Sequence, residues 1–134
     1  HQRRLDRHPE DYQPRIRELL EEGLRCPATV YTASKIQQQQ LRQETLRLLC
    51  DGTILLTPAA TGPAPTADST GNPAFNSPWS YTGLPTINFP SGDFVDGLPL
   101  GLQLVGHPDQ MAALFGAARW CEQVLGTAPL TAGG

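Results

Sequence analysis

Apolar residues in the first half of the chain recur at the three- and four-residue spacing of an α-helix. The first repeat follows Pro9, and its apolar members are Tyr12, Ile16, Leu19, Leu20 and Leu24. We therefore predict a helix over residues 9–22, preceded by an irregular charged segment over residues 1–8. A second, longer helix is predicted over residues 27–50, and Asp51-Gly52 would end it.

Strand patterns replace the helical spacing in the second half of the chain. Residues 53–57 form an apolar run between Gly52 and Pro58, which is typical of a buried strand. Residues 86–89 alternate in polarity, and Pro90-Ser91-Gly92 would end that strand. A third strand is predicted over residues 100–105, after the hairpin turn signal Asp96-Gly97.

Loops and helices separate these predicted strands. Residues 59–72 are rich in Pro, Gly, Thr and Ala without periodicity, which predicts a long loop. A short helix is predicted over residues 78–81, with Ser77 as its N-cap and a left-handed Gly83 at its end. The last helix is predicted over residues 108–126, with His107 capping it, and residues 127–134 should fray.

This order of elements predicts an α/β fold with about three strands and four helices. Three short strands make a poor independent sheet, so we expect further strands beside them and helices on both faces. The segment then reads as a piece of a larger α/β protein. Consistent with this, the chain begins with His1 instead of Met, which suggests that these are not the first residues of the gene product.

Composition narrows the function classes. The formal net charge of −3 argues against a nucleic-acid partner, and no apolar run approaches the roughly 20 residues that span a membrane. The three cysteines, Cys26, Cys50 and Cys121, are widely spaced, which predicts reduced thiols in a cytoplasmic protein.

Four separated blocks resemble the amidase signature family, in the order in which that family has them. The blocks are LLTP (55–58), GPAP (62–65), NSPW through TGLP (76–85) and DGLPLGLQLVG (96–106). The resemblance implies that residues 1–134 are the C-terminal portion of an amidase-signature domain. It also implies that they contribute to the mixed β-sheet of that domain, which helices cover.

The resemblance implies hydrolysis of a carboxamide C–N bond without a cofactor. Members of the family use a serine nucleophile, a second serine held by a cis peptide bond, and a lysine base. No Gly/Ser-rich loop of the kind that carries these serines is present, and Lys35 lies within a predicted helix. We therefore assign no catalytic residue in this chain and expect the catalytic N-terminal portion to lie outside it.

Two other arrangements of reactive residues receive little support. Ser91, Asp96 and His107 lack the strand–turn–helix context of a nucleophile elbow. His1, His8 and Cys26 do not have the spacing of metal ligands, so no metal site is predicted.

The remaining contribution is substrate recognition. Positions that match the pocket wall of the family are Thr70, Phe75, Asn76 and Trp79. For the two aromatic residues core packing is the alternative role, and for Asn76 it is a position in a turn or helix start. The expected partners are a small amide substrate and the remainder of the amidase chain, and a homodimer stays open.

Two alternatives to a hydrolase remain at this point. The chain could be a fragment of the amidase-like component of an amidotransferase, which releases ammonia to a partner and shares these motifs. It could also be a non-catalytic remnant or an interaction fragment.

Overall fold

The computed structural model describes residues 1–126. The chain divides into two compact units, His1–Gln37 and Gln38–Gly134.

The N-terminal unit starts with a helix where an irregular segment was predicted. Helix α1 spans Gln2–Arg7, and a 3₁₀ turn, Pro9–Asp11, follows it. Two features account for this helix. Leu5 is buried, and Arg4 at the end of α1 forms an ion pair with Asp11, with 2.9 Å between Nη2 and Oδ2.

Proline divides the predicted helix over residues 9–22. Gln13 has extended backbone, and helix α2 begins at Pro14 and continues to Arg25. Proline inside a helix removes a backbone hydrogen bond and disfavours helical geometry in the residue before it. Pro14 is therefore a start signal, and Gly23 lies within α2 without ending it.

Helix α3 spans Ala28–Leu48, close to the predicted range of 27–50. A 3₁₀ turn, Cys50–Gly52, ends it, and Asp51 there has a positive φ of 56°. No helix in the described part of the chain is both long and apolar enough to cross a membrane.

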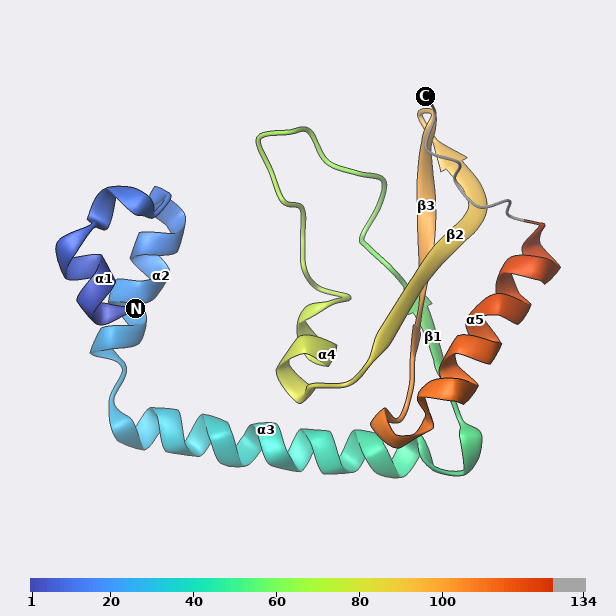
Figure 1. Ribbon diagram of the computed structural model, residues 1–134, viewed down its shortest axis with the longest axis horizontal. Coiled ribbons are helices and arrows are strands. Elements are labelled where there is room, and N and C mark those ends of the chain that lie inside the picture. Colours follow the sequence, from blue (N-terminus) through green and yellow to red (C-terminus); the bar gives the residue numbers. More distant parts are fainter. Residues whose placement is uncertain (127–134) are drawn as a thin grey trace. The chain divides into compact units, whose positions relative to one another are not determined.

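A three-stranded antiparallel sheet forms the centre of the C-terminal unit (Figure 1). The strands are β1 (Leu55–Pro58), β2 (Thr86–Val95) and β3 (Leu98–Val105), in the order β1-β3-β2. The hairpin turn between β2 and β3 is the predicted Asp96-Gly97, and both residues have positive φ, 51° and 77°. The mixed α/β fold class is confirmed.

Strand β2 is longer than predicted. The expected terminator, Pro90-Ser91-Gly92, lies inside the strand, and the pairing with β3 shifts register between Pro90 and Phe94. An irregularity of this kind accommodates proline without ending the strand, because the residues beyond it resume pairing.

Strand β1 lies at an edge of the three-stranded sheet, and within this chain it is not the fully buried strand that was predicted. Its exposure alternates, and Leu56 is 58% exposed while Leu55 packs against the core. Proline is tolerated at an edge, which agrees with Pro58 belonging to the strand instead of closing it.

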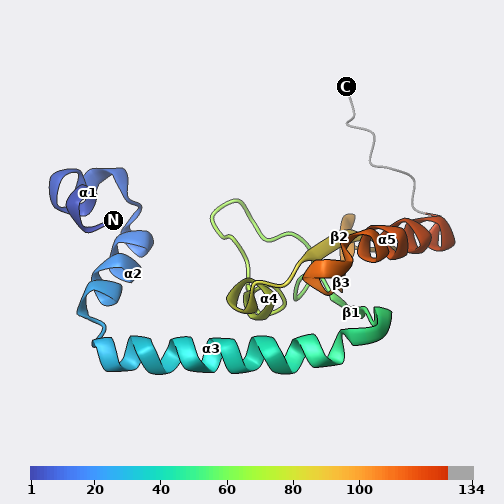
Figure 2. The same ribbon diagram turned by 60° about the horizontal axis from the view of Figure 1, so that its bottom comes forward.

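Helix α5 (Met111–Leu125) covers one face of the sheet, and a smaller cluster packs on the other face (Figures 1 and 2). On the face that α5 covers, the buried core residues are Phe89, Leu104, Leu114 and Ala118. The other face has a second cluster, made of Leu49, Leu84 and Val105, with Trp79 packed against it. Leu49 directly follows α3 and Trp79 belongs to helix α4 (Ser77–Thr82), so the second cluster joins the end of α3 and α4 to the sheet.

The observed ends of α4 and α5 differ slightly from the predicted ones. Asn76, not Ser77, is the N-cap of α4, while Gly83 has the expected left-handed backbone with φ of 65°. The predicted last helix is a 3₁₀ turn, Pro108–Gln110, followed by α5, and His107 caps that turn. The frayed tail predicted for residues 127–134 lies outside the described residues.

Candidate functional site

A long loop between β1 and α4 borders the candidate site. Its two ends, Ala60 to Gly62 and Phe75, line a hollow of about 420 Å³ together with parts of β2 and β3. The other lining residues are Pro58, Ser91, Asp93, Leu100, Gly101 and Leu102. This volume is in the range of small-molecule pockets, and the lining is mostly apolar.

The four residues predicted to bind substrate have different environments. Phe75 is half-buried and lines the hollow. Trp79 packs beside the cluster of Leu49, Leu84 and Val105, which is the core-packing alternative. Thr70 is exposed in the middle of the loop, and it does not belong to the lining of the hollow.

Asn76 connects the loop to the sheet. Its Nδ2 donates to the carbonyl oxygen of Ala59 at 3.2 Å, and its Oδ1 accepts from Gln103 Nε2 at 2.8 Å. The same Gln103 nitrogen donates to Asn88 Oδ1 at 2.9 Å. We call Asn76, Gln103 and Asn88 the amide cluster.

Gln103 is the member that sequence reasoning missed. It is 1% exposed on the central strand, and its backbone pairs with Thr57 on one side and Asn88 on the other. A polar residue within the apolar run LPLGLQLV was the available signal, because a buried amide needs hydrogen-bond partners.

Side chains of α3 fix the end of α4. Arg42 Nη1 donates to the carbonyl oxygens of Thr82 and Gly83, the latter at 2.7 Å. Gln38 donates from Nε2 to the carbonyl oxygen of Tyr81. The last carbonyls of α4, which have no partner inside the helix, are therefore satisfied by side chains of α3.

The reactive residues considered from the sequence have local partners. Ser91 Oγ accepts from the backbone N–H of Asp93 at 3.1 Å, and His107 Nδ1 accepts from that of Asp109 at 3.2 Å. Asp96 occupies the hairpin turn. No group of three or more potential metal ligands occurs among residues 1–126, and the three cysteines have free thiols.

Asp68 is an acid in the loop whose titration is perturbed. The hydroxyl of Thr66 donates to Asp68 Oδ1 at 2.5 Å, which lowers the pKa of the Asp68 carboxyl below its ordinary value. A hydrogen bond to the ionised form favours that form.

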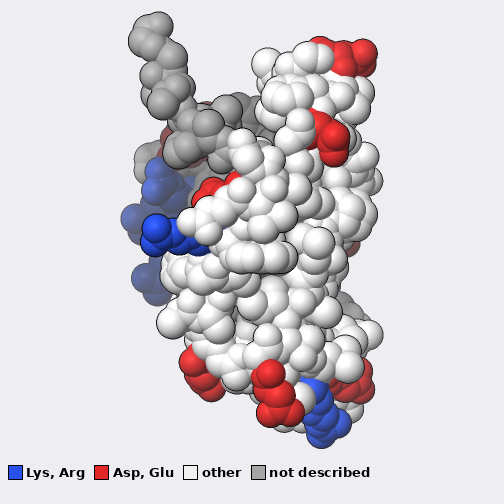
Figure 3. Space-filling view, turned by 90° about the vertical axis from the view of Figure 1, so that its right-hand side faces the viewer, with Lys and Arg blue, Asp and Glu red and all other residues white. Residues whose placement is uncertain are grey.

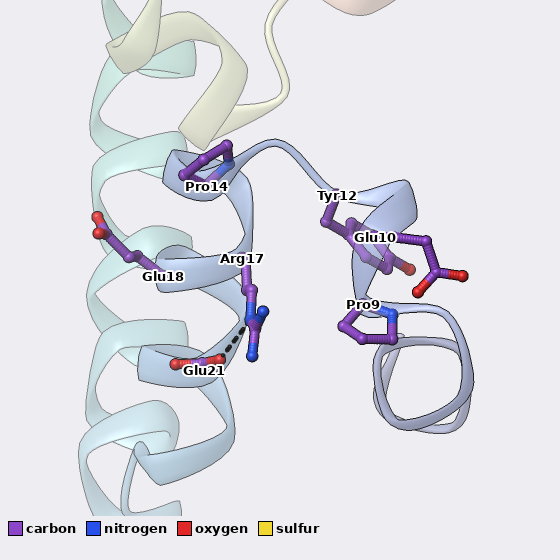
Figure 4. A pocket seen from close by; sticks show the side chains of 7 residues that line it. All are labelled: Pro9, Glu10, Tyr12, Pro14, Arg17, Glu18 and Glu21. Carbon is purple, nitrogen blue, oxygen red and sulfur yellow. Dashed lines mark hydrogen bonds and ion pairs between the residues drawn. The ribbon is translucent and has the colours of Figure 1, made fainter.

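The N-terminal unit has a separate hollow with a volume of about 410 Å³, and Figure 4 shows the side chains that line it. Its lining residues are Pro9, Glu10, Tyr12, Pro14, Arg17, Glu18 and Glu21. Arg17 pairs with Glu21 at 2.9 Å, and both side chains are well exposed. This hollow is therefore part of a solvated helix surface.

No family profile matches the chain, but individual relatives do. Over 112 residues it is 32% identical to fatty-acid amide hydrolase 2 of Homo sapiens, covering 81% of this chain and 21% of that protein. Over 56 residues it is 46% identical to a component of the glutamyl-tRNA(Gln) amidotransferase of Bartonella quintana, covering 42% of this chain and 11% of that component.

A solved structure shares the fold. The crystal structure of an amidase superposes with a TM-score of 0.81 and 28% sequence identity, covering 92% of this chain and 31% of that one. This chain therefore spans about a fifth or less of the two curated relatives and about a third of the solved amidase. Within that length, sequence and structure confirm the resemblance to the amidase signature family.

Proposed function

We propose that this chain is part of an amidase, an enzyme that hydrolyses the C–N bond of a carboxamide. The observation that carries the proposal is the likeness to a solved amidase over 92% of the chain. The relatives named as an amide hydrolase and an amidotransferase component support the same family of reactions.

In this proposal, the residues that cleave the amide bond lie outside this chain. By resemblance, a serine Oγ attacks the amide carbonyl carbon, and its proton passes through a second serine to a neutral lysine. Backbone N–H groups stabilise the resulting oxyanion, the amine leaves with a proton, and water then releases the acid. Lys35 is the lysine of this chain, and it lies exposed in α3, so we assign it no catalytic role.

This chain supplies the sheet and one wall of the substrate pocket. Phe75 is the strongest candidate for contact with the substrate because it lines the hollow beside Leu100 and Leu102. Trp79 supports that wall from the core. Thr70 is proposed to reach the substrate from the loop, whereas the two hydrogen bonds of Asn76 favour a supporting role.

The chain by itself should not hydrolyse amides. Purified 134-residue chain incubated with a chromogenic aryl amide is expected to release no amine above the buffer rate. A chimera that joins this chain to the remaining part of the solved amidase is expected to hydrolyse the same amide. Hydrolysis by the isolated chain would overturn the proposal that the catalytic groups lie outside it. An inactive but folded chimera would count against the proposal that this chain forms one wall of the substrate pocket.

The amidase-like component of an amidotransferase is the second candidate, because the chain is 46% identical to such a component over 56 residues. The two candidates differ in the fate of the nitrogen. An amidotransferase component should co-purify with a partner protein and release ammonia from glutamine, whereas an amidase should act on its amide alone.

The proposal extends to the cellular location and the partners of the enzyme. We place it in the cytoplasm, where free thiols such as the exposed Cys26 and Cys50 persist. Its partners are the amide substrate and the remaining part of the amidase domain, and a homodimer would be seen by sedimentation.

A further inference from the structure

The amide cluster lies on the face of the sheet opposite α5. Side chains alternate along β3, so Gln103 shares its face with Val105, a core residue of that side. The side chain of Gln103 is almost fully buried, and both of its Nε2 hydrogens have acceptors, on Asn76 and Asn88. Leaving a buried donor unpaired costs about 1–3 kcal/mol, so these bonds fix where the two partners lie.

Through Asn76 the cluster holds both ends of the loop. Asn76 directly precedes α4 at the far end of the loop, and its Nδ2 bonds the carbonyl oxygen of Ala59 at the near end. The backbone N–H of Ala59 in turn donates to the carbonyl oxygen of Gly101 on β3 at 2.9 Å. The two ends that line the hollow are thus tied to each other and to the central strand.

The network allows one orientation of the Asn76 amide. Its oxygen faces the Gln103 nitrogen, and its nitrogen faces the Ala59 carbonyl, so a flipped amide would lose both bonds. Gln103 takes part in this network only as a donor, through Nε2. Its Oε1 is buried and has no hydrogen-bond partner among the described residues.

We propose that Gln103, acting through Asn76, positions the loop of residues 59–76 and thereby sets which substrates the hollow admits. This inference rests on the proposed function. Gln103 and Asn76 are positioning residues that do not touch the substrate. Phe75, Leu100 and Leu102 are large apolar members of the lining, which also includes the polar Thr61, Ser91 and Asp93. By this proposal the hollow prefers carboxamides with a bulky apolar group over small ones.

A matched pair of substitutions separates the two hydrogen bonds that Gln103 donates, one to Asn76 and one to Asn88. Asn76→Asp keeps the oxygen that accepts from Gln103 but loses the donor to Ala59, and Asn88→Asp keeps the corresponding oxygen without touching the loop. In the active chimera, kcat/KM would be measured for phenylacetamide and for acetamide. We expect Asn76→Asp to lower the ratio of the two values about tenfold, while Asn88→Asp changes it less than twofold.

The substrate ratio distinguishes positioning from loss of fold, because an unfolded fraction lowers both values equally. Gln103→Glu places a carboxylate against two amide oxygens and should also lower the ratio about tenfold. Gln43→Glu, on the exposed part of α3, should leave it unchanged. A ratio that stays constant in Asn76→Asp and Gln103→Glu would overturn the inference, even with normal amide hydrolysis.

Hydrogen exchange tests the inference without any activity. In the 134-residue chain, the backbone amides of Ala59 and Asn76 should exchange about tenfold faster in Asn76→Asp than in Asn88→Asp. The amides of Leu104 and Val105 in the core should not differ between these variants. Equal exchange at Ala59 and Asn76 in both variants would refute the positioning role, whereas a folded but inactive unsubstituted chimera would count against the proposed function instead.

Discussion

Gly83 shows how one residue closes a helix. It ends α4 with a left-handed φ of 65°, and its carbonyl oxygen accepts a hydrogen bond from Arg42 Nη1. A Cβ at this position would lie 3.1 Å from that same Nη1 atom. Both the backbone conformation and the close neighbour therefore favour glycine here.

Replacing Gly83 should destabilise the fold. Gly83→Ala is expected to lower the free energy of unfolding by about 1–2 kcal/mol, because alanine in the left-handed region costs roughly that much. Urea denaturation monitored by circular dichroism measures the change. Gly116→Ala is the control, since nothing lies within 4 Å of its Cβ position in α5, and it should stabilise by about 0.5–1 kcal/mol. Equal effects would show that Gly83 is not constrained.

The hydrogen bond between Thr66 and Asp68 gives the loop a pH dependence. Because the hydroxyl lowers the pKa of Asp68, the folded value lies below the ordinary 3.8. The associated stabilisation is complete above pH 3.8 and is lost as the pH falls through the folded pKa. Thr66→Val should raise the pKa of Asp68 toward the ordinary value in an NMR titration, while Ser69→Ala should not. An unchanged pKa in Thr66→Val would contradict the assigned cause.

At the level of single residues, the sequence predicted which residues belong to the site better than it predicted their hydrogen-bond partners. Asn76 was recognised as a polar residue at a helix start and a candidate pocket residue. Its bonds to Ala59 and Gln103 were not predictable, because they join residues far apart in the sequence. Local patterns report spacing along one element and contain no information on which side chain reaches across a sheet.

Among the elements, long periodic segments were predicted best. The helix over residues 27–50 and the hairpin at Asp96-Gly97 were confirmed within a few residues. The errors fell on prolines, where Pro14 starts a helix that was expected to run through it and Pro90 lies inside a strand that was expected to stop. Each proline allows two outcomes, and the packing of the neighbouring elements decides between them.

The end of α3 offers a test of packing with two adjacent residues of the same type. Leu49 is fully buried in the cluster with Leu84 and Val105, whereas Leu48 is 66% exposed. Leu49→Ala should lower the free energy of unfolding by about 2–5 kcal/mol, the usual range for a buried leucine. Leu48→Ala should change it by less than about 0.5 kcal/mol. Similar losses in urea denaturation would place the core elsewhere.

For the C-terminal unit as a whole, apolar surface remains uncovered in this chain. Figure 3 looks at the side of the molecule on which α5 lies, and most of its surface is uncharged. Phe115 and Trp120 on α5 are 60% and 63% exposed, and Phe94 near the hairpin turn is 65% exposed. Uncovered apolar patches of this kind mark surfaces that associate with other protein.

The isolated chain should therefore self-associate. Sedimentation velocity is expected to show the average mass rising with concentration. A double substitution, Phe115→Gln with Trp120→Gln, should reduce this association because it removes apolar area without touching the core. Gln123→Glu on the same helix is the control and should behave as the unsubstituted chain does. A chain that stays monomeric at all concentrations would show that the exposed apolar surface of α5 does not drive self-association.

At this scale the motifs were more informative than periodicity. The four blocks implied an α/β segment of an amidase-signature domain, and the solved amidase agrees. Periodicity gave the elements but not the strand order β1-β3-β2 or the face that each helix covers. Those depend on contacts between distant segments, which no single stretch of sequence encodes.

The strand order has a consequence for how the protein is made. Strand β1 pairs only with β3 in the described sheet, and β3 follows it in the chain after the long loop, α4 and β2. A ribosome adds about 5–20 residues per second, so Leu55 and Leu56 wait for seconds without their partner strand. During that interval the edge of β1 that later pairs with β3 has no partner, and chaperones that recognise exposed strand edges have time to bind it.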